Sequence, residues 1–262
     1  MPFTISHVAV VLPFSRRLAR WRLLSAAIIG SMAPDFGWFL PLRPARFETH
    51  SALSLLTFCL PIGLGAYWVF QRLIKRPVIE LLPDGAYRRW REFSDPADYA
   101  SPLQWLLAAV GVLAGAISHL IWDAFTHEGA RGVRMIPALD DPLFEIGGHH
   151  FIGTHLLQDV SSLLGFVMVI ALLAYGLRNG PADAAAVSRP LGRAERRAWA
   201  GGYLLAALVF TVVFFLLRHP ESAAHRLVLP ISNAAIALLR GLAAALLSVS
   251  VFLNLRLRMR PA

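Results

Sequence analysis

Charged residues are scarce in this sequence. Asp, Glu, Lys and Arg make up 16% of its 262 residues, whereas a soluble domain contains about 25%. Acidic residues are the rarer kind, with 16 against 25 basic ones. Together with a hydrophobic share of 56% and a mean hydropathy of +0.57, this composition indicates an integral membrane protein and argues against a soluble domain.

Cysteine is almost absent as well. The single Cys59 lies inside an apolar run, which excludes a disulfide framework and a cysteine-based metal site. The net charge of +9 would suit a nucleic-acid partner, but the sequence contains no nucleic-acid motif. In a membrane protein such an excess places arginines in cytoplasmic loops, so we expect no nucleic acid. The N-terminal stretch "MPFTISHVAVVLPF" also lacks the basic start of a signal peptide.

Long apolar runs are abundant. A helix needs about 20 apolar residues to cross a bilayer, and five segments qualify: about 51–73, 103–125, 156–177, 199–217 and 231–255. Two shorter arms, 3–14 and 23–40, flank the basic tip "SRRLARWR" and predict a helical hairpin over 3–40, whose second arm loses regular helix at Pro34. We expect an all-α, polytopic helical bundle of six or seven hydrophobic segments, forming a single membrane-embedded domain over 1–262.

The distribution of basic residues predicts the orientation. The hairpin tip, the 72–102 loop, the 178–198 loop and the C-terminal tail together hold 18 of the 25 Lys and Arg residues, and the opposite side holds 6. Positive charge concentrates on the cytoplasmic side of membrane proteins. The two loops should therefore be cytoplasmic, and the N-terminus should face outward, with seven segments of which two are short.

His and Asp residues collect at the opposite, extracytoplasmic face. Four pieces of chain deliver them, and two of these pieces contain the spacing H-x-x-x-D, which places both side chains on one helix face. Imidazole and carboxylate together suit zinc, manganese or iron(II). The sequence thus predicts a site for a divalent metal, zinc first, with one to three ions, held by His7, Asp35, His50, His119, Asp123, His127, His155 and Asp159.

A structural interpretation stands beside this one. His and Asp at helix ends often only meet water at the membrane surface, so a single H-x-x-x-D is weak evidence for a metal. His149 and His150, in "GGHHF", read as loop residues rather than ligands. Topology alone also brings many polar residues to one face, so a common depth does not by itself establish contact.

Several motifs resemble a known family. "MPFTISHVAVVLP", "IGSMAPDF", "FETHSALSLL", "GAISHLIWDAFTH" and "LLQDVSSLLG" resemble the bacterial membrane family catalogued as domain of unknown function 4184. That family is similar to the LexA-regulated membrane-bound metal-dependent hydrolases, which share an early His, a PD, a (T)HS and an H-x-x-x-D. The resemblance implies a multi-pass protein of the bacterial inner membrane.

The order of these residues also resembles zinc-dependent phospholipase C and the S1/P1 nucleases, all-helical enzymes with a trinuclear zinc cluster. The resemblance implies one ion at His50, His119 and Asp123, with Asp35 as ligand or catalytic general base. It implies a second ion at His127, His155 and Asp159, and a third at His7, with Asp123 as a bridge. In those enzymes the N-terminal amine is a further ligand, a role that Pro2 would take after removal of Met1; alternatively these residues only begin a helix.

The function expected from the sequence is metal-dependent hydrolysis. A site at the outer face suggests membrane lipid as the partner, with a phospholipid or lipid-linked phosphoester as substrate. The rival hypothesis is a non-catalytic membrane protein whose His and Asp residues form a structural or metal-sensing site. A catalytic site would keep an open coordination position, whereas a structural site would be closed.

Overall fold

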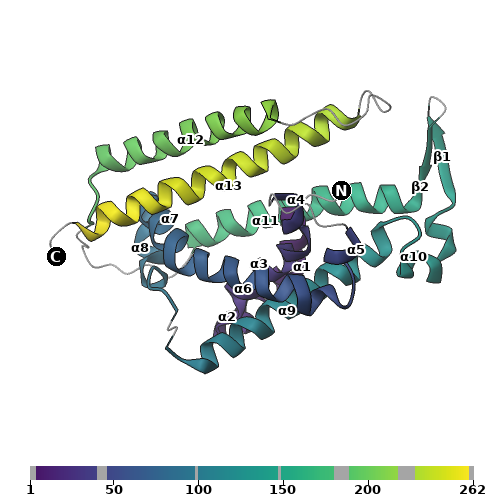
Figure 1. Cartoon of the computed structure of the whole chain (residues 1–262), viewed down its shortest axis with the longest axis horizontal. Helices are drawn as coiled ribbons and strands as arrows, with labels where there is room; N and C mark the ends of the chain where they lie inside the picture. Colours follow the sequence, from purple (N-terminus) through teal and green to yellow (C-terminus); the bar gives the residue numbers. More distant parts are fainter. Residues whose placement is uncertain are drawn as a thin grey trace. The chain divides into compact units, whose positions relative to one another are not determined.

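The structure is a computed structural model that describes residues 4–39, 46–97, 100–146, 149–179, 189–217 and 228–259. The chain divides into two compact units, whose elements are drawn in Figure 1. Unit 1 comprises Met1–Tyr67 and Asp98–Gly176, and unit 2 comprises Trp68–Ala97 and Leu177–Ala262. Apart from one β-hairpin, the elements of the described residues are helical, which agrees with the predicted helical membrane protein.

Four helices among the described residues are long and apolar enough to cross a membrane. They are α9 (Pro102–Thr126), α11 (Gly153–Asn179), α12 (Arg193–Leu216) and the stretch Ala234–Leu257 of α13 (Val228–Arg258). Only 6% of the apolar window of α11 and of α12 is buried within the protein, so most of their hydrophobic side chains face outward. Such outward apolar faces are what a bilayer covers. These helices match four of the five long segments that the sequence predicts.

The fifth predicted segment, 51–73, is helical but irregular. It consists of the π-helix η4 (Leu55–Cys59), the α-helix α6 (Leu60–Val69) and a second π-helix, η5 (Phe70–Ile74), which leads into α7 (Lys75–Leu81). Helical residues run without a break from 54 to 81, although each α-helical piece alone is shorter than a bilayer crossing requires. Insertions of π-helix occur frequently beside functional sites, and η4 begins five residues after His50.

The helical hairpin predicted over 3–40 is present in unit 1. Its first arm contains η1 (Thr4–His7), α1 (Val8–Val11), η2 (Leu12–Phe14) and α2 (Ser15–Arg20). At the tip, Arg22 adopts a left-handed φ of 58°. The second arm contains α3 (Leu24–Met32), η3 (Ala33–Asp35) and α4 (Phe36–Phe39). As expected from Pro34, regular α-helix stops just before the "APD" turn.

Close backbone contact joins α3 to α9. A Cβ added at Gly115 would lie 2.1 Å from the carbonyl oxygen of Ala27, and one added at Gly30 would lie 2.1 Å from that of Val112. Small residues allow this approach between membrane helices. A Cβ added at Gly111 would contact Ala26, and one added at Gly115 would contact Ala27 and Ser31. Because the residue numbers of the contacts increase along both helices, the two helices run in the same direction. Their C-terminal ends therefore lie on the same side of unit 1.

The stretch between the predicted segments 103–125 and 156–177 contains regular structure. It holds α10 (Arg131–Met135), the short η7 (Pro137–Leu139) and an antiparallel hairpin of β1 (Pro142–Ile146) and β2 (His149–Ile152). Phe144 pairs with Phe151 and Glu145 with His150 in the backbone register. In a sequence, "GG" between two short segments of this kind is a typical hairpin signal, so this element could have been predicted.

Unit 2 contains the long helices α12 and α13, which lie side by side (Figure 1). It also contains α7, α8 (Asp84–Trp90) and η6 (Arg91–Phe93), so the predicted 72–102 loop is largely helical. Leu191, Leu253 and Leu257 form a buried cluster, against which Leu81 and Trp199 pack. The side chain of Asn254 donates a hydrogen bond to the carbonyl oxygen of Leu73.

Asp84 is the centre of a basic cluster in unit 2. Arg189 Nη1 and Arg196 Nη2 donate to Asp84 Oδ1 at 2.7 and 2.8 Å, and Arg193 Nη2 lies 3.4 Å from Oδ2. The hydrogen bond from Arg189 holds the pKa of the Asp84 carboxyl below its ordinary value. Burial raises the pKa of Glu80, whose carbonyl oxygen also accepts from Arg189. These contacts join the predicted 72–102 and 178–198 loops, as expected if both lie on one membrane side.

Candidate metal centre

Five of the predicted ligands meet in unit 1. They come from the start of the first hairpin arm, the "APD" turn, the residue after α5 (Arg46–Thr49), and the last two turns of α9. Each lies within 4 Å of at least one other member, and all are buried or nearly so: His7, Asp35, His50, His119 and Asp123. The predicted convergence is confirmed, while the role of these residues as ligands stays a prediction.

The hydrogen bond of His119 determines its tautomer. Its Nδ1 lies 2.8 Å from the carbonyl oxygen of Ser31, which can only accept, so Nδ1 carries the proton. In a neutral ring Nε2 then bears a lone pair. That Nε2 is buried without a hydrogen-bond partner and faces Asp35 Oδ1 at 3.8 Å and Asp123 Oδ2 at 3.6 Å. A positive charge, either a cation between these groups or a proton on Nε2, would balance the two carboxylates.

Hydroxyl groups orient two further members of the cluster. Thr4 Oγ1 donates to Asp35 Oδ2 at 2.8 Å, which leaves Asp35 Oδ1 facing the imidazoles. Thr49 Oγ1 lies 2.7 Å from His50 Nδ1, which leaves His50 Nε2 facing Asp35 Oδ1 at 3.4 Å. Metal-bound histidines usually engage the other ring nitrogen in this way. The sequence analysis missed both threonines, although "TISH" and "ETHS" place a hydroxyl close to each histidine.

The separations within this group are those of ligands rather than of hydrogen bonds. Four of the six distances among Asp35 Oδ1, His50 Nε2, His119 Nε2 and Asp123 Oδ2 are 3.4, 3.7, 3.8 and 3.6 Å. Hydrogen bonds of this kind are shorter, at about 2.7–3.2 Å. Two donors at about 2.0–2.2 Å from one tetrahedral zinc ion lie roughly 3.3–3.6 Å apart. Two of the four separations fall in this range and two lie just above it. We call the space among these four atoms the cage.

His7 extends the cage on one side. Its ring stacks on that of His119, with centroids 3.6 Å apart and planes at 17°. Both ring nitrogens of His7 are buried without a hydrogen-bond partner among the described residues, and Nε2 lies 3.7 Å from Asp123 Oδ1. Two buried imidazoles stacked this closely cannot both be protonated without strong repulsion. At least one of the two rings is therefore neutral, and that ring keeps a lone pair for a cation.

The donor set fits a divalent ion. Imidazole nitrogens with carboxylate oxygens suit zinc, and also manganese or iron(II). The groups His7, His119, Asp123 and Asp35, His50, His119 are each close enough to hold an ion. Both groups use His119, whose Nδ1 is engaged by Ser31, so Nε2 can serve only one ion. One ion in the cage is therefore the simplest occupancy, and His7 with Asp123 Oδ1 could begin a second site.

His127 lies at the edge of the cluster. It follows the last residue of α9, and its Nδ1 is 3.6 Å from Asp123 Oδ2 and 3.2 Å from the carbonyl oxygen of Asp123. Its side chain is 20% exposed, whereas that of His119 is 0% exposed. Of the predicted second ligand set, this is the one member that the described contacts bring to the cluster.

His155 and Asp159 make no contact with the cluster among the described interactions. His155 Nε2 pairs with Glu128 Oε1 at 2.6 Å, and both side chains are more than half exposed. Asp159 is exposed on α11. The geometry therefore gives no support for a second ion held by His127, His155 and Asp159. The side chains of His149 and His150, and the proposed ligand Pro2, lie outside the described residues.

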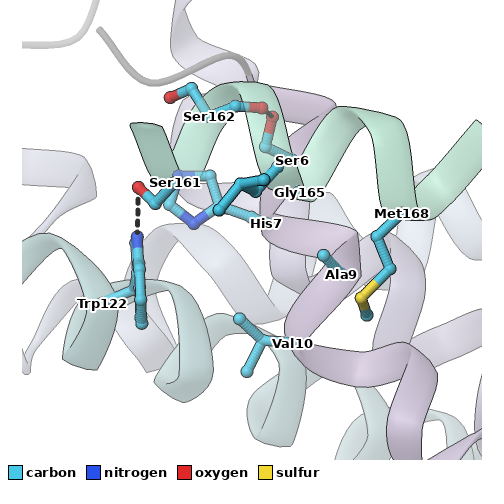
Figure 2. Close-up of a pocket in the computed structure, with 10 residues that line it drawn as sticks. Ser6, His7, Ala9, Val10, Trp122, Ser161, Ser162, Gly165 and Met168 are labelled. Atoms are coloured by element: carbon cyan, nitrogen blue, oxygen red, sulfur yellow. Dashed lines mark hydrogen bonds between the residues drawn. The ribbon is translucent and has the colours of Figure 1, made fainter. Parts of the chain in front are cut away.

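A cavity adjoins the cluster through His7. It has a volume of about 280 Å³ and lies between the first hairpin arm, α9 and α11 (Figure 2). Trp122 Nε1 donates to Ser161 Oγ at 3.3 Å across one of its walls. The cluster is thus buried on most sides but has one neighbouring space large enough for part of a small molecule.

Comparison with known proteins places the chain in a family. The family model described as domain of unknown function, DUF4184, matches residues 1–251. The chain belongs to the DUF4184 family. No curated protein and no solved structure shows a significant match. The likeness of this DUF4184 protein to membrane-bound hydrolases, phospholipase C and the nucleases therefore stays a prediction.

Proposed function

We propose that this DUF4184 protein is a membrane-bound metal-dependent hydrolase. It would cleave phosphoesters of lipids or lipid-linked compounds at the extracytoplasmic face of the bacterial inner membrane. The observation that carries the proposal is the lone pair of His119 Nε2, which faces two carboxylates and His50 at ligand-to-ligand spacing. A divalent cation is the group that best satisfies this arrangement.

The residues of the cluster divide into binding and proton-handling roles. His50, His119 and Asp123 would hold the ion, since their donor atoms point into the cage. Asp35 is the catalytic candidate, because Thr4 occupies only one of its oxygens and leaves the other for a ligand bond or for a water proton. A bound divalent ion lowers the pKa of water and stabilises negative charge on a phosphoryl group.

His7 and the cavity provide access to the site. His7 lines the cavity and also lies 3.7 Å from Asp123. Its imidazole could therefore hold a second ion or pass a proton between the cavity and the cluster. A closed structural site would have no need of a neighbouring space, so the cavity favours catalysis.

Membrane orientation supports an extracytoplasmic site. The 72–102 and 178–198 loops, which carry 11 of the 25 basic residues, are joined through Asp84 and Arg189. The cluster lies at the opposite end of α9 from its start at Pro102. If the basic loops are cytoplasmic, as the positive-inside rule predicts, then His119 and Asp123 lie toward the outer face.

One observation favours the rival function, a structural or metal-sensing site. If Asp35, His50, His119 and Asp123 all bound one ion, these four protein donors would close its coordination shell, as in structural zinc sites. The rival predicts a bound ion with no hydrolysis. The hydrolase proposal requires that one donor, Asp35, can give way to water or substrate.

The test is metal content and hydrolysis measured on the same preparations. Full-length protein, purified without chelators, should contain about one divalent ion per chain and should hydrolyse a phosphoester such as bis-p-nitrophenyl phosphate. His119→Ala should lose both. His155→Ala is the matched control, because this exposed histidine pairs only with Glu128 among the described contacts, and it should keep both. Wild-type protein without metal would refute the proposal, and metal without hydrolysis would favour the rival.

A further inference from the structure

The cavity beside His7 has two chemically different ends. Figure 2 shows Ser161 and Ser162 at one end and Met168 at the other, with His7 between them. Ala9, Val10 and Leu164 add to the apolar wall. Pockets for small molecules are usually lined in this way, with apolar side chains and a few polar groups that fix orientation.

The polar end has unused hydrogen-bonding capacity. The Ser162 hydroxyl is buried and has no hydrogen-bond partner among the described residues. Its backbone carbonyl, in contrast, accepts from Ser6 Oγ at 2.6 Å, which fixes α11 against the first hairpin arm. The contact is tight, since a Cβ added at Gly165 would lie 2.9 Å from the carbonyl oxygen of Ser6. These contacts fix α11 against the first hairpin arm, and the position of this wall of the cavity is therefore fixed.

The surroundings of the cavity are apolar. It lies between α9 and α11, two of the helices able to cross a membrane. Leu164 lines the cavity and is 62% exposed, and Ile121, next to Trp122, is 58% exposed. In a bilayer these exposed side chains meet lipid tails. The compound that reaches the cavity most readily is therefore one already dissolved in the membrane.

We infer that this cavity binds the aliphatic chain of a membrane amphiphile, with its polar head at Ser162 and His7. The chain-binding part rests on the cavity alone, and the head-group part rests on the proposed function, since it places a phosphoester next to the metal cluster. The apolar end at Ala9, Val10 and Met168 would take the chain. A finite cavity of about 280 Å³ has room for one chain segment and not for a two-chain lipid in full.

Photo-crosslinking tests the inference directly. The full-length protein, in nanodiscs of phosphatidylcholine, is exposed to dodecyl phosphate or to dodecanol, each with a diazirine at the end of the chain. Crosslinks are mapped by mass spectrometry. Both probes should label the peptides that contain Ala9, Val10 or Met168, with or without a chelator. Labelling spread evenly over the exposed residues of α11 would overturn the inference.

Two tryptophan substitutions form a matched pair. Met168→Trp fills the apolar end and should reduce labelling at Ala9 and Val10 at least tenfold. Val167→Trp changes the neighbouring residue, which is 54% exposed and does not line the cavity, and should alter labelling less than twofold. Ala9→Phe repeats the block from the other wall, in case Met168→Trp does not fold. Equal labelling in the blocked and control variants would overturn the inference.

The head-group part has its own readout. In metal-loaded protein the phosphate probe should label at least fivefold more strongly than the alcohol, and chelation or Asp123→Asn should remove the difference. If the phosphate probe and the alcohol probe labelled metal-loaded protein equally, the head-group assignment would be overturned. If the protein holds no metal and hydrolyses nothing, the proposed function fails, but labelling that Met168→Trp abolishes would still establish the chain site.

Discussion

The two polar clusters of this protein satisfy their carboxylates in opposite ways. In unit 2, Asp84 accepts short hydrogen bonds of 2.7 and 2.8 Å from Arg189 and Arg196. In unit 1, Thr4 donates to Asp35 Oδ2 at 2.8 Å, but Asp35 Oδ1 and both Asp123 oxygens lie 3.4–3.8 Å from imidazole nitrogens, farther than a short hydrogen bond. The first cluster is complete with the protein's own charges, whereas the second has the spacing of a site that is completed by a cation.

The contrast also follows from burial. The Asp84 side chain is 44% exposed, so water stabilises any charge that the arginines leave uncompensated. The Asp123 side chain is 9% exposed and that of His119 is 0% exposed. Burying charge is strongly unfavourable unless opposite charge compensates it. The comparison therefore predicts that removing a cation affects unit 1 and leaves the Asp84 cluster unchanged.

The largest expected effect comes from removing the ion. A chelator should lower the stability of the wild-type protein by about 3–4 kcal/mol, the linkage energy at a ligand concentration of 100–1,000 times Kd. Asp123→Asn should have a similar cost and abolish the response to chelator, because Asp123 contacts four histidines. Thermal unfolding in detergent with and without chelator measures both. Asp84→Asn should respond to chelator as the wild-type protein does. If Asp84→Asn also abolished this response, the comparison would be contradicted.

The next effect concerns the packing that builds the site. Gly115→Val introduces atoms where a Cβ already lies 2.1 Å from the Ala27 carbonyl oxygen, so α3 and α9 must separate. Overpacking of this kind costs about 1–3 kcal/mol, and separation would also weaken the bond from His119 to Ser31. Thermal unfolding and metal content should both fall.

Gly202→Val provides the control for this substitution. Gly202 lies in α12, and nothing is within 4 Å of a Cβ added there. This variant should keep its metal and unfold near the wild-type temperature. Equal metal loss in the two glycine variants would show that the close approach of α3 and α9 does not position the cluster.

A smaller effect should follow from losing an orienting hydroxyl. Thr4→Val removes the hydrogen bond to Asp35 Oδ2 but keeps the shape of the side chain. Losing such an outer contact typically weakens metal binding about 10–100-fold. Metal titration should show this drop, and Thr4→Ser should restore most of the affinity. An unchanged affinity in Thr4→Val would remove Thr4 from the site.

Much of the fold could be predicted from the sequence, for a physical reason. A run of about 20 apolar residues has few alternatives to a membrane helix, so α9, α11, α12 and α13 were located within a few residues at most ends. Pro34 likewise marked where regular helix stops. The π-turns within 51–81 have no comparable signal, because they depend on how the helix packs against its neighbours.

The site was predictable only in part. Helix ends on one membrane face bring His7, Asp35, His50 and Asp123 to a common depth, and depth can be counted along the chain. The spacing H-x-x-x-D shows that two side chains share a helix face, but not what that face meets. The convergence predicted from this spacing was confirmed for His119 and Asp123, which face the hairpin. In the second motif, His155 pairs with Glu128 and Asp159 is exposed.

The smallest expected effect is the pH response of the exposed cluster. Because Arg189 lowers the pKa of Asp84, its ionised form favours the folded state. That stabilisation is complete above the unfolded-state pKa of about 3.9 and is lost as the pH falls through the lower folded-state pKa. Wild-type protein should therefore be slightly more stable than Asp84→Asn at pH 7, and the difference should vanish in strong acid. Unfolding measured from pH 7 down to pH 3, with chelator present throughout, isolates this effect from the metal cluster. A difference that grew as the pH fell would mean that the three arginines around Asp84 do not stabilise its charge, and the contrast between a self-sufficient cluster and a cation-dependent one would no longer hold.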